Sequence, residues 1–233
     1  MPEKTFKLQG ELVHQLNRVL RLPPGAKVLL LDGTGREYLA ELTQFNKNGI
    51  IEGKVLEEQI AVGEPRTQIT IFQALLKGEK FEYVLQKATE VGAKAFVPML
   101  TERVIGGSSP AKLERWRKIV QEAAEQSRRG IVPEVAEPLS FGLALKQATQ
   151  GGLALLAWED EKTRSLRAAL QSAPEPPRKL SLLIGPEGGL SQAEVEQARG
   201  LGVQTISLGP RILRAETAGP IATALILYEM GDI

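Results

Sequence analysis

Short, nearly continuous apolar segments alternate with helical segments along residues 69–233. Strands of this kind have no polar side, so both faces of the sheet that they form must be covered. Helices that return the chain between parallel strands provide this cover. The pattern therefore predicts an α/β domain built on a parallel sheet. Its expected strands are residues 69–76, 93–100, 153–158, 180–185 and 203–209.

The segments between these strands carry helical signals. Residues 80–92 and 110–129 place their apolar side chains on one face at helical spacing. Ser191 and Glu194 form the pattern of a capping box, which predicts that a helix over 192–202 begins just after them. The apolar positions of the two long helices are Phe81, Val84, Leu85, Ala88 and Val91, then Leu113, Trp116, Val120 and Ala123.

The first part of the chain has a different pattern. Two apolar runs within residues 26–42 flank Asp32-Gly33, which is a strong hairpin signal. A further strand is expected at residues 49–58, and an amphipathic helix at 12–22. We expect a small β-barrel or sheet domain closed by a helix, spanning residues 1–68, followed by the α/β domain at 69–233.

The residues that the chain lacks limit its chemistry. Its 233 residues include no cysteine and one histidine, His14. This composition excludes disulfides, thiolate metal sites, cysteine nucleophiles and multi-histidine metal sites. No apolar run has the length of a membrane span, and the N-terminus has no signal-peptide core. We therefore expect a cytoplasmic protein with no membrane partner and no metal, whose chemistry uses carboxylates, arginines, lysines, hydroxyls and backbone amides.

Ligands of parallel sheets bind at the carboxyl ends of the strands, so the loops after 153–158, 180–185 and 203–209 are the candidate site. The second loop reads "GPEGGLSQAE", and its glycines allow backbone amides to approach a ligand. No dinucleotide or P-loop motif is present, and Glu187 would repel a phosphate. A Gly-Pro turn with a good helix cap explains part of this loop. The glycines around Glu187 favour a nucleoside-type cofactor held by backbone amides.

Two stretches of these loops, "LLIGPEGGLSQAEVE" and "GLGVQTISLGPRILRAETA", resemble the bacterial small-subunit ribosomal RNA uridine-N3 methyltransferases. These enzymes belong to the SPOUT superfamily, whose C-terminal domain contains a trefoil knot. The resemblance continues upstream through "FQALLKGEKFEYVLQKATEVG" and "KLERWRKIVQEAAEQSRRG". It reaches "HQLNRVLRLPPGAKVLLLDGTG", which is similar to the PUA-like RNA-binding module of that family.

The resemblance implies an enzyme that takes a methyl group from S-adenosylmethionine. Its substrate would be N3 of one uridine in 16S ribosomal RNA of the small ribosomal subunit, of the uracil-1498 type. It also implies a homodimer, which the final segment 220–231 favours because it is apolar on nearly every face. Two other functions stay open: a non-catalytic RNA-binding protein whose glycine loops are turns, and a related SPOUT RNA methyltransferase with another target.

Individual roles follow from the same resemblance. Arg129 is mapped to the arginine of the family pattern E-Q-S-G-R, where this chain has Arg128 in place of glycine. Catalysis is expected from Glu216, Arg214 and Arg129, and RNA binding from Arg18, Arg21 and Arg211. The cofactor is expected to contact Leu156, Ile184, Gly185, Glu187, Gly189, Leu208, Gly209, Ile212, Leu213 and Thr217.

The N3–H of uracil must lose its proton, and a positioned base accelerates such a step. With no suitable histidine or cysteine, the candidates are Glu216, Glu187 and Glu90, with Glu216 ranked first. Arg214 could stabilise the negative charge that develops on the uracil oxygens. Each carboxylate also has a structural interpretation, because Glu216 lies near a helix start and Glu90 on a helix face.

Overall fold

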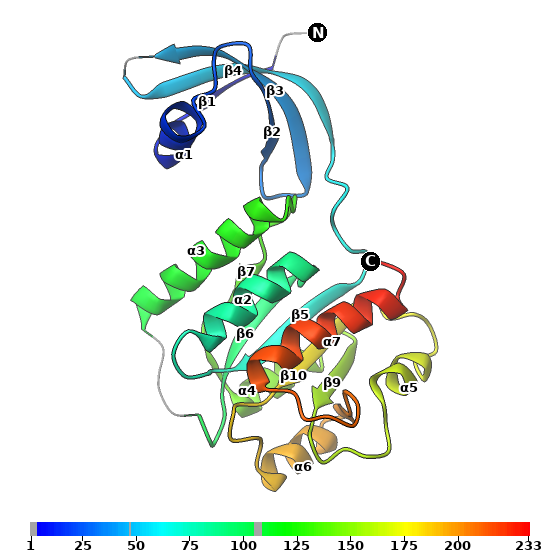
Figure 1. Ribbon diagram of the computed structural model, residues 1–233. Helices are drawn as coiled ribbons and strands as arrows, with labels where there is room; N and C mark the ends of the chain where they lie inside the picture. Colours follow the sequence, from blue (N-terminus) through cyan, green and yellow to red (C-terminus); the bar gives the residue numbers. More distant parts are fainter. Residues whose placement is uncertain (1–3, 47, 105–108) are drawn as a thin grey trace. The chain divides into compact units, whose positions relative to one another are not determined.

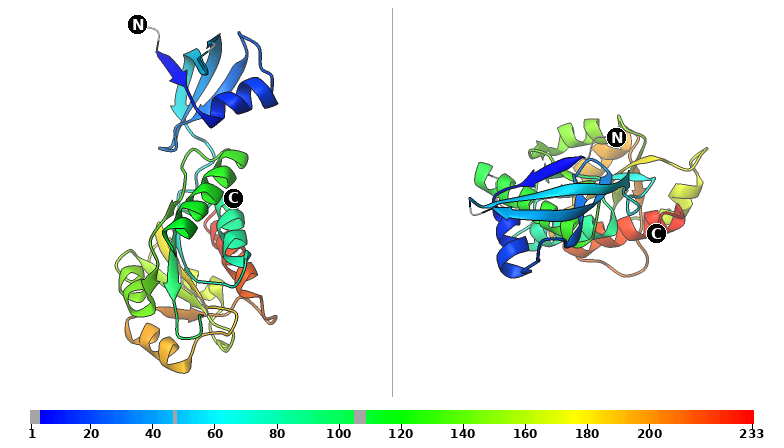
Figure 2. Two further views of the ribbon diagram at one scale, coloured as in Figure 1. Left: turned by 90° about the vertical axis from the view of Figure 1, so that its left-hand side faces the viewer. Right: turned by 90° about the horizontal axis from the view of Figure 1, so that it is seen from above.

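The computed structural model describes residues 4–46, 48–104 and 109–233 (Figures 1 and 2). It divides into two compact units. The N-terminal unit comprises Met1–Glu64 with Arg128–Ile131, and the C-terminal unit comprises Pro65–Ser127 with Val132–Ile233. The division into domains 1–68 and 69–233 stays a prediction. The compact units differ from it at residues 65–68 and by the short segment 128–131.

The N-terminal unit is an antiparallel sheet with a helix. Its strand order is β1-β4-β3-β2, and the helix α1 continues as a π-helical turn, η1. The predicted hairpin at Asp32-Gly33 is confirmed, and the Asp32 carboxylate accepts hydrogen bonds from the amide and hydroxyl of Thr34 at 2.8 and 2.7 Å. The elements are β1 (Thr5–Leu8), α1 (Glu11–His14), η1 (Gln15–Val19), β2 (Lys27–Leu31), β3 (Arg36–Asn46) and β4 (Ile50–Ile60).

A segment from the middle of the chain completes this unit. Glu64 accepts hydrogen bonds from the Arg129 guanidinium at 2.7 Å and from the Ile131 amide at 3.0 Å. The Gly35 amide donates to the carbonyl of Gly130 at 2.8 Å. Only 3% of the Arg129 side chain is exposed. The pair formed by Arg129 and Glu64 therefore anchors residues 128–131 within the N-terminal unit.

The C-terminal unit has the predicted parallel sheet. Its strand order is β11-β9-β10-β5-β6-β7, and β8 also pairs with β6. All of these pairings are parallel. The five expected strands correspond to β5, β6, β9, β10 and β11, while β7 and β8 are short additions. The strands are β5 (Gln68–Ala74), β6 (Ala95–Leu100), β7 (Glu134–Val135), β8 (Leu139–Ser140), β9 (Leu153–Ala157), β10 (Lys179–Ile184) and β11 (Gln204–Ile206).

Helices cover both faces of this sheet (Figure 1). Alternate residues of a strand point to opposite faces, so Ile71 joins the core on one side of the sheet and Phe72 the core on the other. The first core contains residues of α2, α3, α5 and α7, and the second contains residues of α4 and α6. The helices are α2 (Lys80–Val91), α3 (Pro110–Gln126), α4 (Phe141–Ala148), α5 (Leu166–Gln171), α6 (Gln192–Gly200) and α7 (Ala215–Glu229).

The helix starts follow the sequence signals closely. Ser191 and Glu194 form the predicted capping box at the start of α6. The last helix, α7, begins at Ala215, which confirms that Glu216 lies near a helix start. Glu216 and Thr217 consequently lie in its first turn, which follows directly after the loop that leaves β11. The C-terminal knot stays a prediction from the family resemblance.

Gly130→Ala tests the anchoring of the 128–131 segment. A Cβ atom at this position would overlap the Cβ of Ala61, which is buried. We expect a loss of about 2 kcal/mol of stability from overpacking, measured by thermal unfolding followed by circular dichroism. Gly151→Ala is the control, because a Cβ there meets no atom within 4 Å. Equal unfolding temperatures for the two variants would contradict the close packing of residues 128–131 within the N-terminal unit.

Candidate active site

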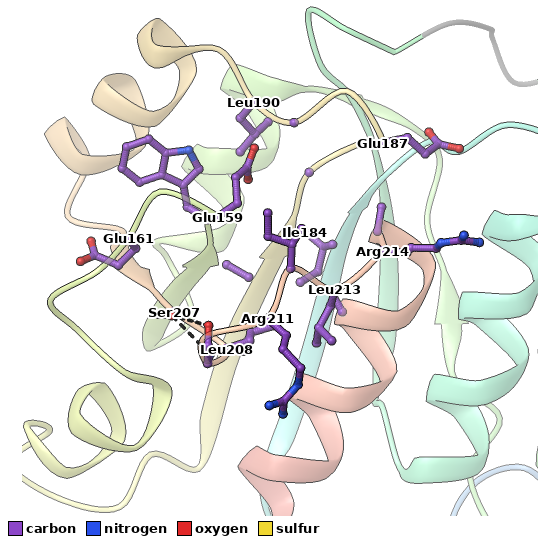
Figure 3. Close-up of a pocket in the computed structure, with 18 of the residues that line it drawn as sticks. Glu159, Glu161, Ile184, Glu187, Leu190, Ser207, Leu208, Arg211, Leu213 and Arg214 are labelled. Carbon is purple, nitrogen blue, oxygen red and sulfur yellow. Dashed lines mark hydrogen bonds between the residues drawn. The ribbon is translucent and has the colours of Figure 1, made fainter.

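A cavity of about 820 Å³ lies at the carboxyl ends of β9, β10 and β11 (Figure 3). The loops that follow these three strands form its walls, together with the first turn of α7. These are the loops to which the strand-end rule directs attention. The predicted cofactor residues that line the cavity are Ile184, Gly185, Glu187, Gly189, Leu208, Gly209, Ile212 and Leu213.

Two of the predicted cofactor residues lie elsewhere. Leu156 is fully buried in β9, in the core that also contains Phe72 and Leu183. Thr217 lines a neighbouring cavity rather than this one. The alternation of strand residues explains the first case, since Leu156 points into the sheet core and Ala157, the next residue, lines the cavity.

The glycine loop after β10 allows a close approach between two walls. Gly189 has a φ of 69°, and a Cβ there would lie 2.5 Å from Oε1 of Glu159. The Arg103 guanidinium donates a hydrogen bond to the carbonyl of Gly188 at 2.8 Å. Any larger residue at position 189 would therefore displace the Glu159 carboxylate from the cavity wall.

The loop after β11 also depends on a glycine. Gly209 has a φ of 116°, a conformation that residues with a side chain rarely adopt, and nothing lies within 4 Å of the position of its missing Cβ. The amide and carbonyl of Gly209 both hydrogen-bond with the Ser207 hydroxyl at 3.3 Å. Figure 3 labels Ser207 and Leu208 in this turn and draws hydrogen bonds of Ser207 as dashed lines. These hydrogen bonds fix the backbone of this loop, and the missing side chain of Gly209 leaves that backbone accessible from the cavity.

A buried carboxylate, Glu161, holds the loop after β9. It accepts hydrogen bonds from the hydroxyls of Thr163 and Thr205, both at 2.6 Å, and from the Arg199 guanidinium at 3.2 Å. The Thr163 hydroxyl and then the Thr205 hydroxyl are the main reasons that the pKa of Glu161 falls to about 2. Backbone amides of Thr163 and Arg164 add to this effect. Glu161 therefore ties the β9 loop to β11.

Sequence reasoning missed Glu161. Its partner Thr205 lies 44 residues away in the sequence, and no local motif predicts the contact. The acidic run "WEDE" after an apolar strand is the only signal that could have drawn attention to it. Arg199 also stacks over the Trp158 ring, 5.0 Å from its centroid, so this network includes a second residue of the cavity wall.

Lys80 connects the glycine loop to α7. Its ammonium lies 3.3 Å from Oε1 of Glu187 and 3.7 Å from Oε1 of Glu216. Burial alone would raise the pKa of Glu187, but hydrogen bonds from its own amide, the Lys77 amide and Lys80 outweigh burial, so this pKa is lowered. Glu187 is consequently held as a carboxylate and is a poorer proton acceptor than its position suggests.

Glu216 has a different environment. Only 14% of its side chain is exposed, and Oε2 is buried with no hydrogen-bond partner among the residues that the structure describes. Arg214 precedes α7 as its N-cap residue and is exposed at the same cavity. No ion pair of Arg214 occurs within the described part of the chain. Among the described residues, Glu216 thus has a carboxylate oxygen without a hydrogen bond, and Arg214, which lines the same cavity, has a guanidinium without an ion pair.

The remaining predicted residues are dispersed. Arg211 is exposed at the cavity, whereas Arg18, Arg21 and Arg129 belong to the N-terminal unit. Glu90 pairs with Lys87 at 2.8 Å on α2, and it lines neither this cavity nor the neighbouring one. Of the three base candidates, the structure therefore places Glu216 and Glu187 at the cavity.

Two features are missing from the described residues. Across residues 4–46, 48–104 and 109–233 there is no group of three or more His, Asp or Glu side chains placed to hold a metal ion. None of the helices in these ranges combines the length and the apolar character that crossing a bilayer requires.

Comparison with known proteins gives two family matches. The family model of the RNA methyltransferase domain matches residues 63–227, and that of the RNA methyltransferase PUA domain matches residues 8–51. Ribosomal RNA small subunit methyltransferase E of Synechocystis sp. is 42% identical over 96% of this chain and 73% of its own length. The protein of that name from Bacillus subtilis is 35% identical over 97% of this chain and 90% of its own.

A solved structure agrees with these matches. Ribosomal RNA small subunit methyltransferase E from Neisseria gonorrhoeae, bound to S-adenosyl methionine, superposes with a TM-score of 0.87 at 32% identity. The alignment covers 98% of this chain and 93% of that chain. Together with the cavity at the strand ends, these likenesses establish that the chain belongs to the RNA methyltransferase family that includes ribosomal RNA small subunit methyltransferase E.

Proposed function

We propose that this protein is an S-adenosylmethionine-dependent methyltransferase that modifies N3 of a specific uridine in 16S ribosomal RNA, in the cytoplasm. The observation that carries the proposal is the cavity in which three strand-end loops meet Glu216 and Arg214. The names of the relatives support the RNA of the small subunit as substrate. The cofactor bound to the Neisseria protein supports the methyl donor.

The cavity fits this cofactor chemically. Ile184, Leu208 and Leu213 offer apolar surface for the adenine ring, while the glycine loops offer backbone amides and carbonyls. Glu159 and Glu187 suit the cationic amino group and sulfonium. S-adenosylmethionine supplies an electrophilic methyl carbon, so the transfer breaks one carbon–sulfur bond, forms one carbon–nitrogen bond and releases the N3 proton.

Glu216 takes that N3 proton, and Arg214 stabilises the negative charge on the adjoining uracil oxygen. Glu216 lines both the first cavity and its neighbour, and its Oε2 has no competing hydrogen bond among the described residues, which supports this role. Arg129 stays a candidate for catalysis through the family resemblance alone, and its contact with Glu64 is structural.

The proposal extends to partners. Arg18, Arg21 and Arg211 are exposed and suit RNA phosphates, whose contacts would make binding weaken with salt. Ile221, Leu225 and Tyr228 lie on one face of α7 with 44%, 42% and 66% of their surfaces exposed. This apolar stripe supports a homodimer formed through α7.

Cofactor binding separates this function from a non-catalytic RNA-binding protein. We expect calorimetry to show approximately stoichiometric binding of S-adenosylhomocysteine. Gly209→Val should weaken this binding on the order of 100-fold, since a β-branched residue strains a backbone with φ of 116°. Gly151→Val, at an open position with an ordinary φ, is the control. Undetectable binding to the unaltered protein at millimolar ligand would contradict the enzyme assignment.

The Glu161 network should make the stability of the C-terminal unit depend on pH. The folded pKa of about 2 lies below the ordinary value of 4.5, so Glu161 contributes stability above pH 4.5 that is lost as the pH falls through 2. Glu161→Gln should cost about 2 kcal/mol at pH 7, and less at pH values approaching 3.

Urea unfolding followed by tryptophan fluorescence measures this loss, because Trp116 and Trp158 both belong to the C-terminal unit. Asp160→Asn, an exposed change in the same loop, is the control and should have no effect beyond about 0.5 kcal/mol. A deficit in Glu161→Gln that stayed constant down to pH 3 would show that the carboxylate charge is unimportant.

The reaction itself is tested with ribosomal RNA that lacks the modification. Mass spectrometry of the digested product should show N3-methyluridine at one position, and a ribose methyl group instead would favour another SPOUT activity. Glu216→Gln keeps the size of the side chain but loses its basicity. It should lower the single-turnover rate on the order of 100-fold or more, with cofactor and RNA affinities little changed.

Glu90→Gln serves as the matched control for this experiment, because Glu90 is a carboxylate outside both cavities. Near-normal turnover by a folded Glu216→Gln protein would remove Glu216 from the mechanism.

A further inference from the structure

A second cavity of about 660 Å³ adjoins the first. One face of α2, Ile119 of α3 and the first turn of α7 line it. Lys80, Arg214 and Glu216 line both cavities, so these three side chains form the boundary between them. A methyl donor in the first cavity and an acceptor in the second would meet at this boundary, as an in-line transfer requires.

The charges of the second cavity favour a neutral ring over a phosphate. Glu79, Glu82 and Glu216 line it, against the two cations Lys80 and Arg214. Arg115 pairs with Glu82 at 2.7 Å and lies 4.0 Å from Glu79, but it does not line the cavity. With Arg115 counted, the three carboxylates and three cations balance, so this wall has no excess positive charge to attract a phosphate, and its carboxylates can accept hydrogen bonds from N–H donors.

The boundary residues match one base edge in particular. Lys80 and Arg214 are donors, and the Glu216 carboxylate, which lies 3.7 Å from the Lys80 ammonium, is an acceptor. The edge of uracil presents the complementary series of O4, N3–H and O2. Cytosine has a lone pair at N3, which would face the Glu216 carboxylate without a proton between them. The same three side chains could therefore discriminate between the two pyrimidines.

Tyr83 supplies a flat surface in the same cavity. It lies on α2, one turn after Lys80, and 49% of its surface is exposed. Unpaired bases that proteins remove from a stack are commonly held against aromatic side chains.

We propose that the second cavity receives the uracil base of the acceptor nucleotide. Tyr83 stacks on the ring, and Lys80, Glu216 and Arg214 bind its O4, N3–H and O2 edge. This assignment rests on the proposed methyl transfer to uridine, and it makes Tyr83 a substrate-binding residue.

Tyr83→Ala and Tyr83→Phe test the stacking. With unmodified ribosomal RNA, the alanine variant should lose roughly 10- to 100-fold in kcat/KM, while the phenylalanine variant stays within a few fold. Affinity for S-adenosylhomocysteine should be unchanged in both. Leu143→Ala truncates an exposed side chain on α4, outside both cavities, and controls for a general loss of packing.

Photocrosslinking gives a readout that does not depend on methylation. Ribosomal RNA transcribed with 5-iodouridine should crosslink on irradiation to a peptide that contains Tyr83. Normal kcat/KM for Tyr83→Ala, or crosslinks that omit this peptide, would overturn the proposal. A change of Tyr83→Ala from dimer to monomer in sedimentation would also overturn it, by showing that a second copy of the chain covers the cavity.

These outcomes separate the two proposals. A wild-type protein that makes no N3-methyluridine contradicts the proposed function, and the crosslink still decides whether a base occupies the second cavity.

Discussion

The arrangement of the site depends on the ion pairs that the Lys80 ammonium makes. This ammonium joins Glu187, in the glycine loop after β10, to Glu216, in the first turn of α7. Without this cation, two carboxylates would face each other across the cavity. Glu161 has the corresponding role between β9 and β11, where it accepts hydrogen bonds from Thr163, Thr205 and Arg199. The loops after β9 and β10 and the first turn of α7 are thus held by carboxylates that contact residues of other helices and strands.

Whether the sequence predicts an interaction depends on how far apart the interacting residues lie along the chain. Apolar runs, helical spacing and the Ser191–Glu194 cap are local, so they predicted the parallel sheet, its main helices and the loops that carry the site. The pairing of Lys80 with Glu187 spans 107 residues, and no periodicity encodes it. The second cavity was missed for the same reason, since it exists only where α2, α3 and α7 meet.

At two neighbouring residues, Arg128 and Arg129, the structure adds a physical explanation to the family pattern. The resemblance identified Arg129 as the arginine of the family pattern, and the structure shows it paired with Glu64 in the N-terminal unit. Arg128 has a φ of 58°, in the left-handed region that glycine adopts freely. An arginine there costs about 1–2 kcal/mol, which gives a physical reason for the glycine of the family pattern.

The two oxygens of Glu216 explain how one side chain can be both a structural element and a base. Oε1 faces Lys80, which holds the carboxylate at the boundary of the two cavities. Oε2 is buried and has no hydrogen-bond partner among the described residues. A buried acceptor without a partner is unfavourable, and a donor that enters the site relieves this cost. In the proposed reaction the N3–H of a uracil is such a donor, so binding this base would stabilise the site and bring the proton to the Glu216 carboxylate.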